Sequence, residues 1–223
     1  MKINSMPKIR LVAVTKGAGD LEDKSAEEII TFAARVSSDK SDIERLGNAE
    51  RLLRYCLRHG HVSIFETASM TVEVTTSRAI AEQLIRHRSF TFQVKSYRYA
   101  ECHSNEPYKA RRQDKLNRQN SIGDLSEELQ GWFMDAQEKV NTTCQIAYDE
   151  AIDKGIAREC ARFLLPLSAS TVLFMTGNCR SFLHYIQTRS GHGTQEEHKA
   201  IAEAILEIFA GQFPLICRAA GLI

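Results

Sequence analysis

The sequence of 223 residues has no long apolar run, only four prolines and no pair of closely spaced cysteines. No stretch approaches the ~20 consecutive apolar residues that a membrane-spanning helix needs. The first residues also lack the apolar core of a secretory signal peptide. These features predict a cytoplasmic protein without a membrane segment. With 12 glycines and no internal repeat, the chain is neither collagen-like nor of low complexity.

The six cysteines form no CxxC motif, which excludes a zinc ribbon and a dithiol redox motif. We therefore expect all six to be reduced and to serve as small core residues. The histidine pairs His59/His61 and His192/His198 have no third metal-binding side chain nearby in the sequence. No metal site is predicted.

The overall charge is nearly balanced, with 29 lysines and arginines against 28 aspartates and glutamates. A protein that coats DNA or RNA non-specifically would show a clear basic excess, so this class is excluded. Hydrophobic residues make up 43% of the chain and charged residues 26%, as in ordinary globular proteins. The length and the absence of linker-like composition predict a single domain over residues 1–223.

Several segments show clear secondary-structure patterns. Residues 67–76 alternate between apolar and polar side chains, which predicts a half-buried strand. Residues 9–16 and 170–174 are also expected to be extended. Capping boxes at Ser25/Glu28, Ser41/Glu44 and Thr194/Glu197 predict three helix starts. Because the helices outnumber the strands, we expect an α+β fold with a central, mostly antiparallel sheet and flanking helices.

Four further helices are predicted, of which a short one covers residues 156–165 and stops at Pro166. Ser77 begins one with Ile80, Leu84 and Ile85 turned inward. Residues 178–188 form another, with apolar side chains spaced three and four apart. The longest begins at Ser126 and ends at Gly155, and its apolar face is expected to be buried. That face consists of Trp132, Phe133, Val140, Ile146, Ala147 and Ile152.

The charge is segregated along the chain. Residues 86–118 hold nine basic and three acidic side chains, and the remainder of the chain has an excess of acids. Most of these bases are arginines, whose planar guanidinium groups suit phosphates and carboxylates. They alternate with aromatic residues, so a binding site for phosphorylated ligands is predicted. A single-stranded RNA-binding module remains the alternative, because aromatic rings stack on bases and arginines hold phosphates.

The segment Arg86-His-Arg-Ser-Phe-Thr-Phe-Gln-Val-Lys-Ser-Tyr-Arg-Tyr99 resembles the signature of flavin-dependent thymidylate synthases, R-H-R-x-x-S-x-(N/Q)-x-x-S-x-R-Y. Of the eight specified positions only Thr91 differs, and it keeps the hydroxyl group. The segments Arg111-Arg-Gln-Asp114 and Ala161-Arg-Phe-Leu-Leu-Pro166 also resemble family segments, in the same order. The resemblance covers nearly the whole chain.

The resemblance implies reductive methylation of dUMP to dTMP. Methylenetetrahydrofolate would supply the carbon, NADPH the reducing equivalents, and FAD would carry the hydride. It also implies a homotetramer with active sites built from several subunits. The implied ligands are small molecules, with neither a nucleic acid nor a membrane among the partners.

The resemblance further assigns site residues by motif position. Arg189 would be the catalytic cation facing the uracil ring, and His61 would lie near flavin and folate. The positions implied to hold FAD are Ser63, Arg86, His87, Arg88, Asn178, Arg180 and His184. The positions implied to hold dUMP are Gln83, Arg86, Lys95, Ser96, Tyr97, Arg98, Arg162 and Arg189.

Overall fold

The computed structural model describes residues 7–36, 49–191 and 193–223. A four-stranded antiparallel sheet has the order β1-β2-β6-β3, and a separate two-stranded ribbon joins β4 to β5. The three predicted strands are confirmed as β1, β2 and β6, whereas β3, β4 and β5 lie where no strand was predicted. The strands are β1 (Lys8–Val14), β2 (Ser69–Ser77), β3 (Thr91–Val94), β4 (Arg112–Gln113), β5 (Ser121–Ile122) and β6 (Ser170–Asn178).

The helices account for more of the described residues than the strands do, so the α+β prediction is confirmed. Short 3₁₀ turns occur at η1 (Gly19–Leu21), η4 (Ser63–Glu66) and η5 (Arg162–Leu164). The α-helices are α1 (Ala26–Arg35), α2 (Ala49–Arg58), α3 (Arg78–Leu84), α4 (Glu127–Asp153), α5 (Arg158–Ala161), α6 (Cys179–Arg189), α7 (Glu196–Gln212) and α8 (Pro214–Ala220).

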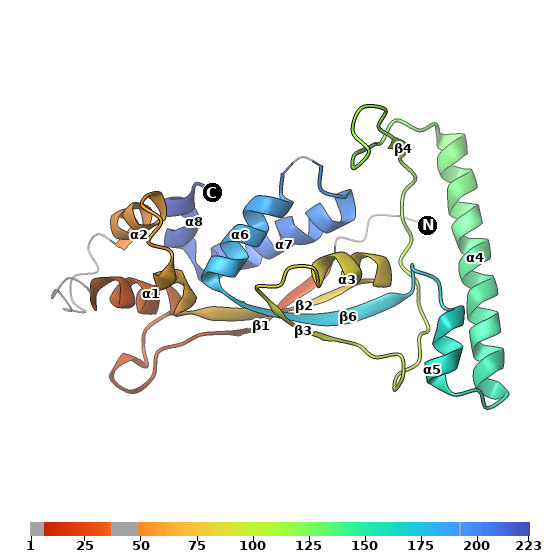
Figure 1. The fold of residues 1–223 in the computed structure, drawn as a ribbon, viewed down its shortest axis with the longest axis horizontal. Coiled ribbons are helices and arrows are strands. Elements are labelled where there is room, and N and C mark those ends of the chain that lie inside the picture. Colours follow the sequence, from red (N-terminus) through yellow and green to blue (C-terminus); the bar gives the residue numbers. More distant parts are fainter. Residues whose placement is uncertain (1–6, 37–48, 192) are drawn as a thin grey trace.

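The two faces of the main sheet differ in what covers them. Helices α1, α2, α3, α6 and α7 lie on one side, and the opposite side carries no described helix (Figure 1). The alternation of β2 follows this arrangement, because Met70, Val72 and Val74 are buried beneath the helices. On the open face, Arg10 donates two hydrogen bonds to the Glu73 carboxylate, at 2.9 and 2.8 Å.

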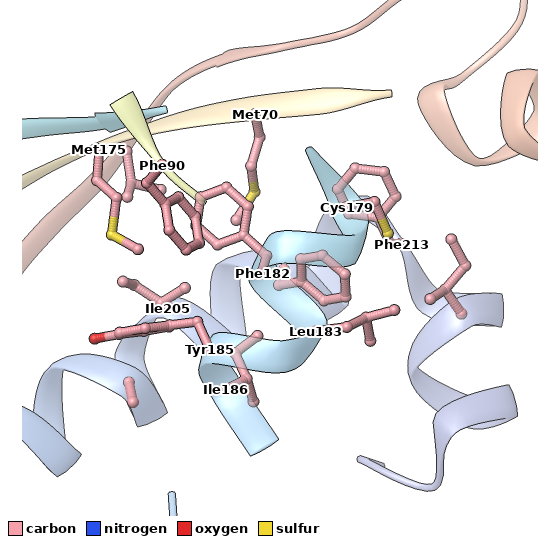
Figure 2. Close-up of a cluster of buried hydrophobic side chains, with 14 of the residues drawn as sticks. Met70, Phe90, Met175, Cys179, Phe182, Leu183, Tyr185, Ile186, Ile205 and Phe213 are labelled. Atoms are coloured by element: carbon pink, nitrogen blue, oxygen red, sulfur yellow. The ribbon is translucent and has the colours of Figure 1, made fainter. Parts of the chain in front are cut away.

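The core lies between the sheet and α6, where apolar side chains from distant segments meet (Figure 2). Phe182 of α6 is fully buried, and its ring meets the edge of Phe90 at a centroid distance of 4.8 Å. Phe90 also lies against Gly177, where an added Cβ would come within 2.4 Å of the Phe90 ring. Close packing of β6 on this ring therefore requires glycine at that position.

Some of the predicted helix starts are confirmed and one is wrong. The capping box of Ser25 and Glu28 is confirmed at α1, and Ser77, Ser126 and Asn178 cap α3, α4 and α6. The Ser41/Glu44 box lies outside the described residues. The Thr194/Glu197 box is wrong, because α7 begins at Glu196 with Gln195 as its N-cap. A tertiary ion pair with Arg111, at 2.7 Å, occupies the Glu197 side chain instead.

The predicted burial of the long helix is wrong for three of the six residues of its apolar face, whereas Ile152 packs against a buried cluster that includes Tyr148 and Ala151. In α4, Trp132 is 66% exposed, Val140 54% and Ile146 55%. The helix stands at the end of the sheet, away from α1 and α2 (Figure 1). Its inward face carries glutamines, and it packs on the extended segment 102–110 through their amides. Two of them, Gln130 and Gln137, each accept a backbone N–H and donate to the carbonyl of the same residue.

Two smaller expectations are also corrected. Ile85 is 42% exposed, because it follows the last turn of α3 and faces a cavity rather than the core. Of the six free cysteines, Cys160 is exposed and Cys144 only half-buried, so not all six are core residues. Within the described residues, no single helix is long and apolar enough to cross a membrane, and α7 with α8 passes that test only across a 119° bend.

Candidate functional site

Most of the predicted site residues fall into three groups within one chain, each defined by the elements that hold it. We call the first the Arg189 cluster: Gln83, His87, Tyr185, Arg189 and His198, where α3, α6 and α7 meet. The second is the Arg162 pocket, on the other side of α3. The third is the Arg180 end, formed by η4 and the first turn of α6. Each group contains several of the predicted site residues.

In the Arg189 cluster, the catalytic candidate is held by a histidine. Arg189 is the last residue of α6, and its Nε donates a 2.9 Å hydrogen bond to Nε2 of His87. Burial and the charge of Arg189 lower the pKa of His87 to about 4, so His87 is neutral and carries its proton on Nδ1. The other guanidinium nitrogens of Arg189 form no hydrogen bond within the part of the chain that the structure describes, so they can serve a ligand.

Beneath Arg189 lie two buried polar side chains. The ring of Tyr185 meets the edge of His87 at 4.9 Å and lies 5.8 Å from His198. Figure 2 shows the Tyr185 hydroxyl at the edge of the apolar cluster, and burial raises its pKa well above the ordinary value. His198 is 1% exposed, and burial with the nearby Arg189 lowers its pKa to about 4.

The Arg162 pocket is a cavity of about 190 Å³ between α3, the end of β3 and η5. Four residues implied to hold dUMP line it: Lys95, Ser96, Tyr97 and Arg162. Tyr97 is buried and its hydroxyl donates to the carbonyl of Ser170, which fixes this wall of the pocket. The other lining residues are Arg78, Ala81, Glu82, Ile85, Val94 and Thr171.

Helix α3 divides the implied dUMP residues. Glu82 lines the Arg162 pocket, whereas the next residue, Gln83, turns its amide toward α7. Successive helical residues point about 100° apart, so these two side chains serve different surfaces. Gln83 and Arg189 therefore do not share a cavity with Lys95, Ser96 and Arg162 in one chain.

The Arg180 end lies at the opposite terminus of α6, about 15 Å from Arg189 by helical rise. Ser63 lies on η4, and Asn178 caps α6 by accepting from the N–H of Ser181 at 2.9 Å. Arg180 forms an ion pair with Glu66 at 2.5 Å. This group gathers Ser63, Asn178 and Arg180 as expected, and it adds Glu66. His61, just before η4, is exposed beside Tyr55 and His59.

Some of the predicted cationic side chains form an ion pair with a carboxylate of the same chain, and others do not. Arg98 pairs with Glu159 at 2.9 Å and Arg180 with Glu66. Among the described residues, no ion pair with a carboxylate is formed by five others. These are Arg86, Arg88, Lys95, Arg162 and Arg189.

Unpaired guanidinium groups at a surface favour the binding of anions. Arg86 and Arg88 are exposed, which suits them to an anionic group such as a phosphate. His184 lies on the same face of α6 as Arg180, one turn further along, and is close enough to contribute to the lowered pKa of His87. No group of three or more potential metal ligands occurs among the described residues.

Comparison with known proteins defines the class first. The family model described as "Thymidylate synthase complementing protein" matches residues 20–215. The chain is 48% identical over 211 residues to the probable flavin-dependent thymidylate synthase of Paramecium bursaria Chlorella virus 1, covering 94% of this chain and 97% of that one. It is 46% identical over 213 residues to the flavin-dependent thymidylate synthase of Synechocystis sp., covering 95% and 98%.

Among solved structures, the chain resembles the UMP/dUMP methylase PolB from Streptomyces cacaoi, solved with 5-Br dUMP bound. The TM-score is 0.84 at 26% identity, and the match covers 100% of this chain and 98% of PolB. The chain belongs to the flavin-dependent thymidylate synthase family.

Sequence reasoning missed several residues of the site. His198 was set aside because no third ligand lies near it in sequence, yet its neighbours come from α3 and α6. Gln195 lies three residues before His198, a spacing that places both on one helical face and could have drawn attention to the pair. A larger cavity of about 240 Å³, beside Tyr108 and Arg111, is lined by none of the predicted site residues.

Proposed function

We propose that this chain methylates dUMP reductively to dTMP, with FAD, NADPH and methylenetetrahydrofolate as cofactor and co-substrates. The observation that carries the proposal is the set of cations that form no carboxylate ion pair within the described residues, which lie in the signature segment, η5 and α6. dUMP brings a phosphate, FAD a pyrophosphate and the folate a carboxylate, all of which such cations bind. The family membership supplies the reaction class.

Arg189 is the residue proposed to act on the substrate ring. A fixed cation beside the pyrimidine stabilises negative charge that develops at N3 and O2, which makes C5 nucleophilic. The hydrogen bond to neutral His87 holds the guanidinium in place without neutralising it. His87 thus orients the catalytic cation, a role compatible with a flavin contact through the rest of its ring.

The flavin is proposed to bind along α6 and the signature segment. Arg86 and Arg88 would hold its pyrophosphate, and the Arg180 end and His184 would contact the remainder. When bound, FAD would supply hydride transfer between the nicotinamide and the one-carbon unit. His61 would lie near the flavin and folate, where its exposed ring can contact a planar ligand.

We also propose a homotetramer in which each dUMP site combines two chains. The Arg189 cluster of one copy would face the Arg162 pocket of another, which reunites the residues that α3 separates within one chain. The exposed apolar stripe of α4 supports such an assembly, because contiguous exposed apolar side chains mark interfaces. This stripe consists of Leu129, Trp132, Val140 and Ile146.

The direct test is tritium release from [5-³H]dUMP by the purified protein, together with its visible spectrum. We expect a yellow preparation, or one that binds added FAD, and tritium release that requires both NADPH and methylenetetrahydrofolate. Omitting either co-substrate is the matched control. A colourless protein that fails to bind added FAD, or FAD-loaded protein that releases no tritium, would contradict the proposed reaction.

A further inference from the structure

A continuous row of polar side chains joins α7 to α3 behind the Arg189 cluster. Gln195 donates from Nε2 to the Glu197 carboxylate at 2.9 Å. Gln83 donates from Nε2 to Oε1 of Gln195 at 2.6 Å. His198 lies 3.2 Å from Oε1 of Gln83 through its Nδ1. Arg111 anchors the far end, because it binds Glu197 with two nitrogens at 2.7 and 2.8 Å.

The chemistry of this row allows only one direction of donation. An ionised carboxylate only accepts, so Gln195 must present its NH₂ to Glu197 and its carbonyl to Gln83. Gln83 must then present its NH₂ to Gln195, and its carbonyl must accept from His198. Although burial raises the pKa of Glu197, hydrogen bonds from Arg111 and Gln195 outweigh it and hold that pKa below the ordinary value. Glu197 therefore stays ionised and fixes the sequence of donors.

Burial of the His198 imidazole is energetically unfavourable, and packing alone does not explain why a histidine stands at this position. Its side chain is 1% exposed, and Nε2 has no hydrogen-bond partner among the described residues. An unpaired buried nitrogen is unfavourable, and an apolar side chain would avoid this penalty. The contact that distinguishes His198 from an apolar residue is the one to Gln83.

We propose that Arg111, Glu197, Gln195 and His198 act as positioning residues that lock the amide orientation of Gln83 toward dUMP. The inference rests on the proposed function, in which Gln83 holds dUMP. In the locked state, one N–H and one carbonyl lone pair of Gln83 remain for the nucleotide. We call this row of side chains from Arg111 to Gln83 the relay. It presents dUMP with one donor and one acceptor at fixed positions, whereas a Gln83 amide that could rotate would not fix which group is the donor.

The test compares two substitutions at His198 in the FAD-loaded enzyme. His198→Leu removes the donor to Gln83, whereas His198→Asn keeps one, because its Nδ2 occupies nearly the place of Nδ1. We expect His198→Leu to raise the dUMP KM about ten-fold with little change in kcat, as loss of ground-state binding does. His198→Asn should recover most of that loss. Equal loss in both variants, or none in His198→Leu, would overturn the proposal.

A second variant and an NMR spectrum distinguish failure of this inference from misfolding of the His198 variants. They also distinguish it from failure of the proposed function. Gln195→Leu alters an exposed residue and should also raise the dUMP KM several-fold. In ¹⁵N-histidine NMR, the signal lost in His198→Asn should show the proton on Nδ1. A proton on Nε2 of His198 would contradict the proposed donation to Gln83, whether or not the chain binds dUMP. A wild-type chain that binds no dUMP would reject the proposed function, and the histidine spectrum alone would then decide the relay.

Discussion

Helices α6 and α4 show opposite ways of attaching an amphipathic helix to the rest of the chain. In α6, Phe182, Tyr185 and Ile186 are fully buried against the sheet and α7. In α4, Tyr148 and Ala151 are the only buried residues of a 27-residue helix, and Gln130 and Gln137 hold it through amide contacts to the backbone. The apolar stripe of α4 points away from its own chain.

This difference shows that an apolar stripe on a helix indicates a buried surface, but the stripe can be covered by the same chain or by another copy. An extended backbone segment such as 102–110 has orphan N–H and C=O groups, and a glutamine amide satisfies one of each. The inward face of α4 can therefore be polar, which leaves the apolar stripe for another surface. We expect α6 to determine the stability of the subunit and α4 to determine its assembly.

The largest expected effect is on subunit stability through α6. Phe182→Ala would leave a cavity in the aromatic cluster and should reduce the free energy of unfolding by about 3–5 kcal/mol. Denaturant unfolding at fixed protein concentration measures this change. Leu116→Ala, at a side chain 98% exposed, is the control and should change the free energy by less than about 0.5 kcal/mol. Similar losses in both variants would refute the assignment of the core.

The next effect concerns assembly through α4. Trp132→Glu places a charge within the exposed apolar stripe and should lower the mass found by light scattering, with the helical circular dichroism unchanged. Glu138→Lys, an equally exposed site on another face of the same helix, is the matched control and should leave the mass unchanged. If Trp132→Glu assembles like the wild type, the stripe is not the interface.

A smaller, local effect would test the amide contacts of α4. Gln137→Leu leaves the N–H and carbonyl of Tyr108 unpaired, which should cost about 1–3 kcal/mol of local stability. Amide hydrogen exchange should become faster over residues 106–110 and stay unchanged in β6. Unchanged exchange over 106–110 would show that these contacts do not hold the segment.

A further effect is a pH dependence from the region of α6 and α7. The pKa values of His87 and His198 are lowered from 6.5 to about 4, so the unfolded chain binds more protons between these values. The free energy of unfolding should therefore rise with pH from about 4 to 6.5 and then level off for these groups. Urea unfolding across this range measures it. A slope that His87→Asn and His198→Asn do not reduce would contradict the assignment.

Much of this fold could be predicted from the sequence, because local patterns and tertiary packing agree in it. The alternation in β2 and the caps at Ser25 and Ser77 are local signals that the structure keeps. The predictions failed where distant residues compete. The Glu197 side chain binds Arg111 instead of capping the helix, and Trp132 of α4 is exposed instead of buried.

The sequence names a set of candidate site residues, and the structure adds how they are arranged. Spacing alone could not show that α3 places Gln83 and Arg162 on different surfaces, or that His198 meets Gln83 across two helices. The assignment of the site residues to FAD, dUMP and folate stays a prediction.

The central claim is that one dUMP site combines the Arg189 cluster of one copy with the Arg162 pocket of another. Subunit mixing tests it most directly. Arg189→Ala and Arg162→Ala are each expected to abolish most turnover, and the two inactive proteins can be unfolded together and refolded as mixed tetramers.

If the two residues act from different chains, equal mixing should restore about a quarter of the wild-type sites, and tritium release should recover accordingly. If both residues act from the same chain, every site keeps one substitution. No recovery in verified mixed tetramers would then contradict the account.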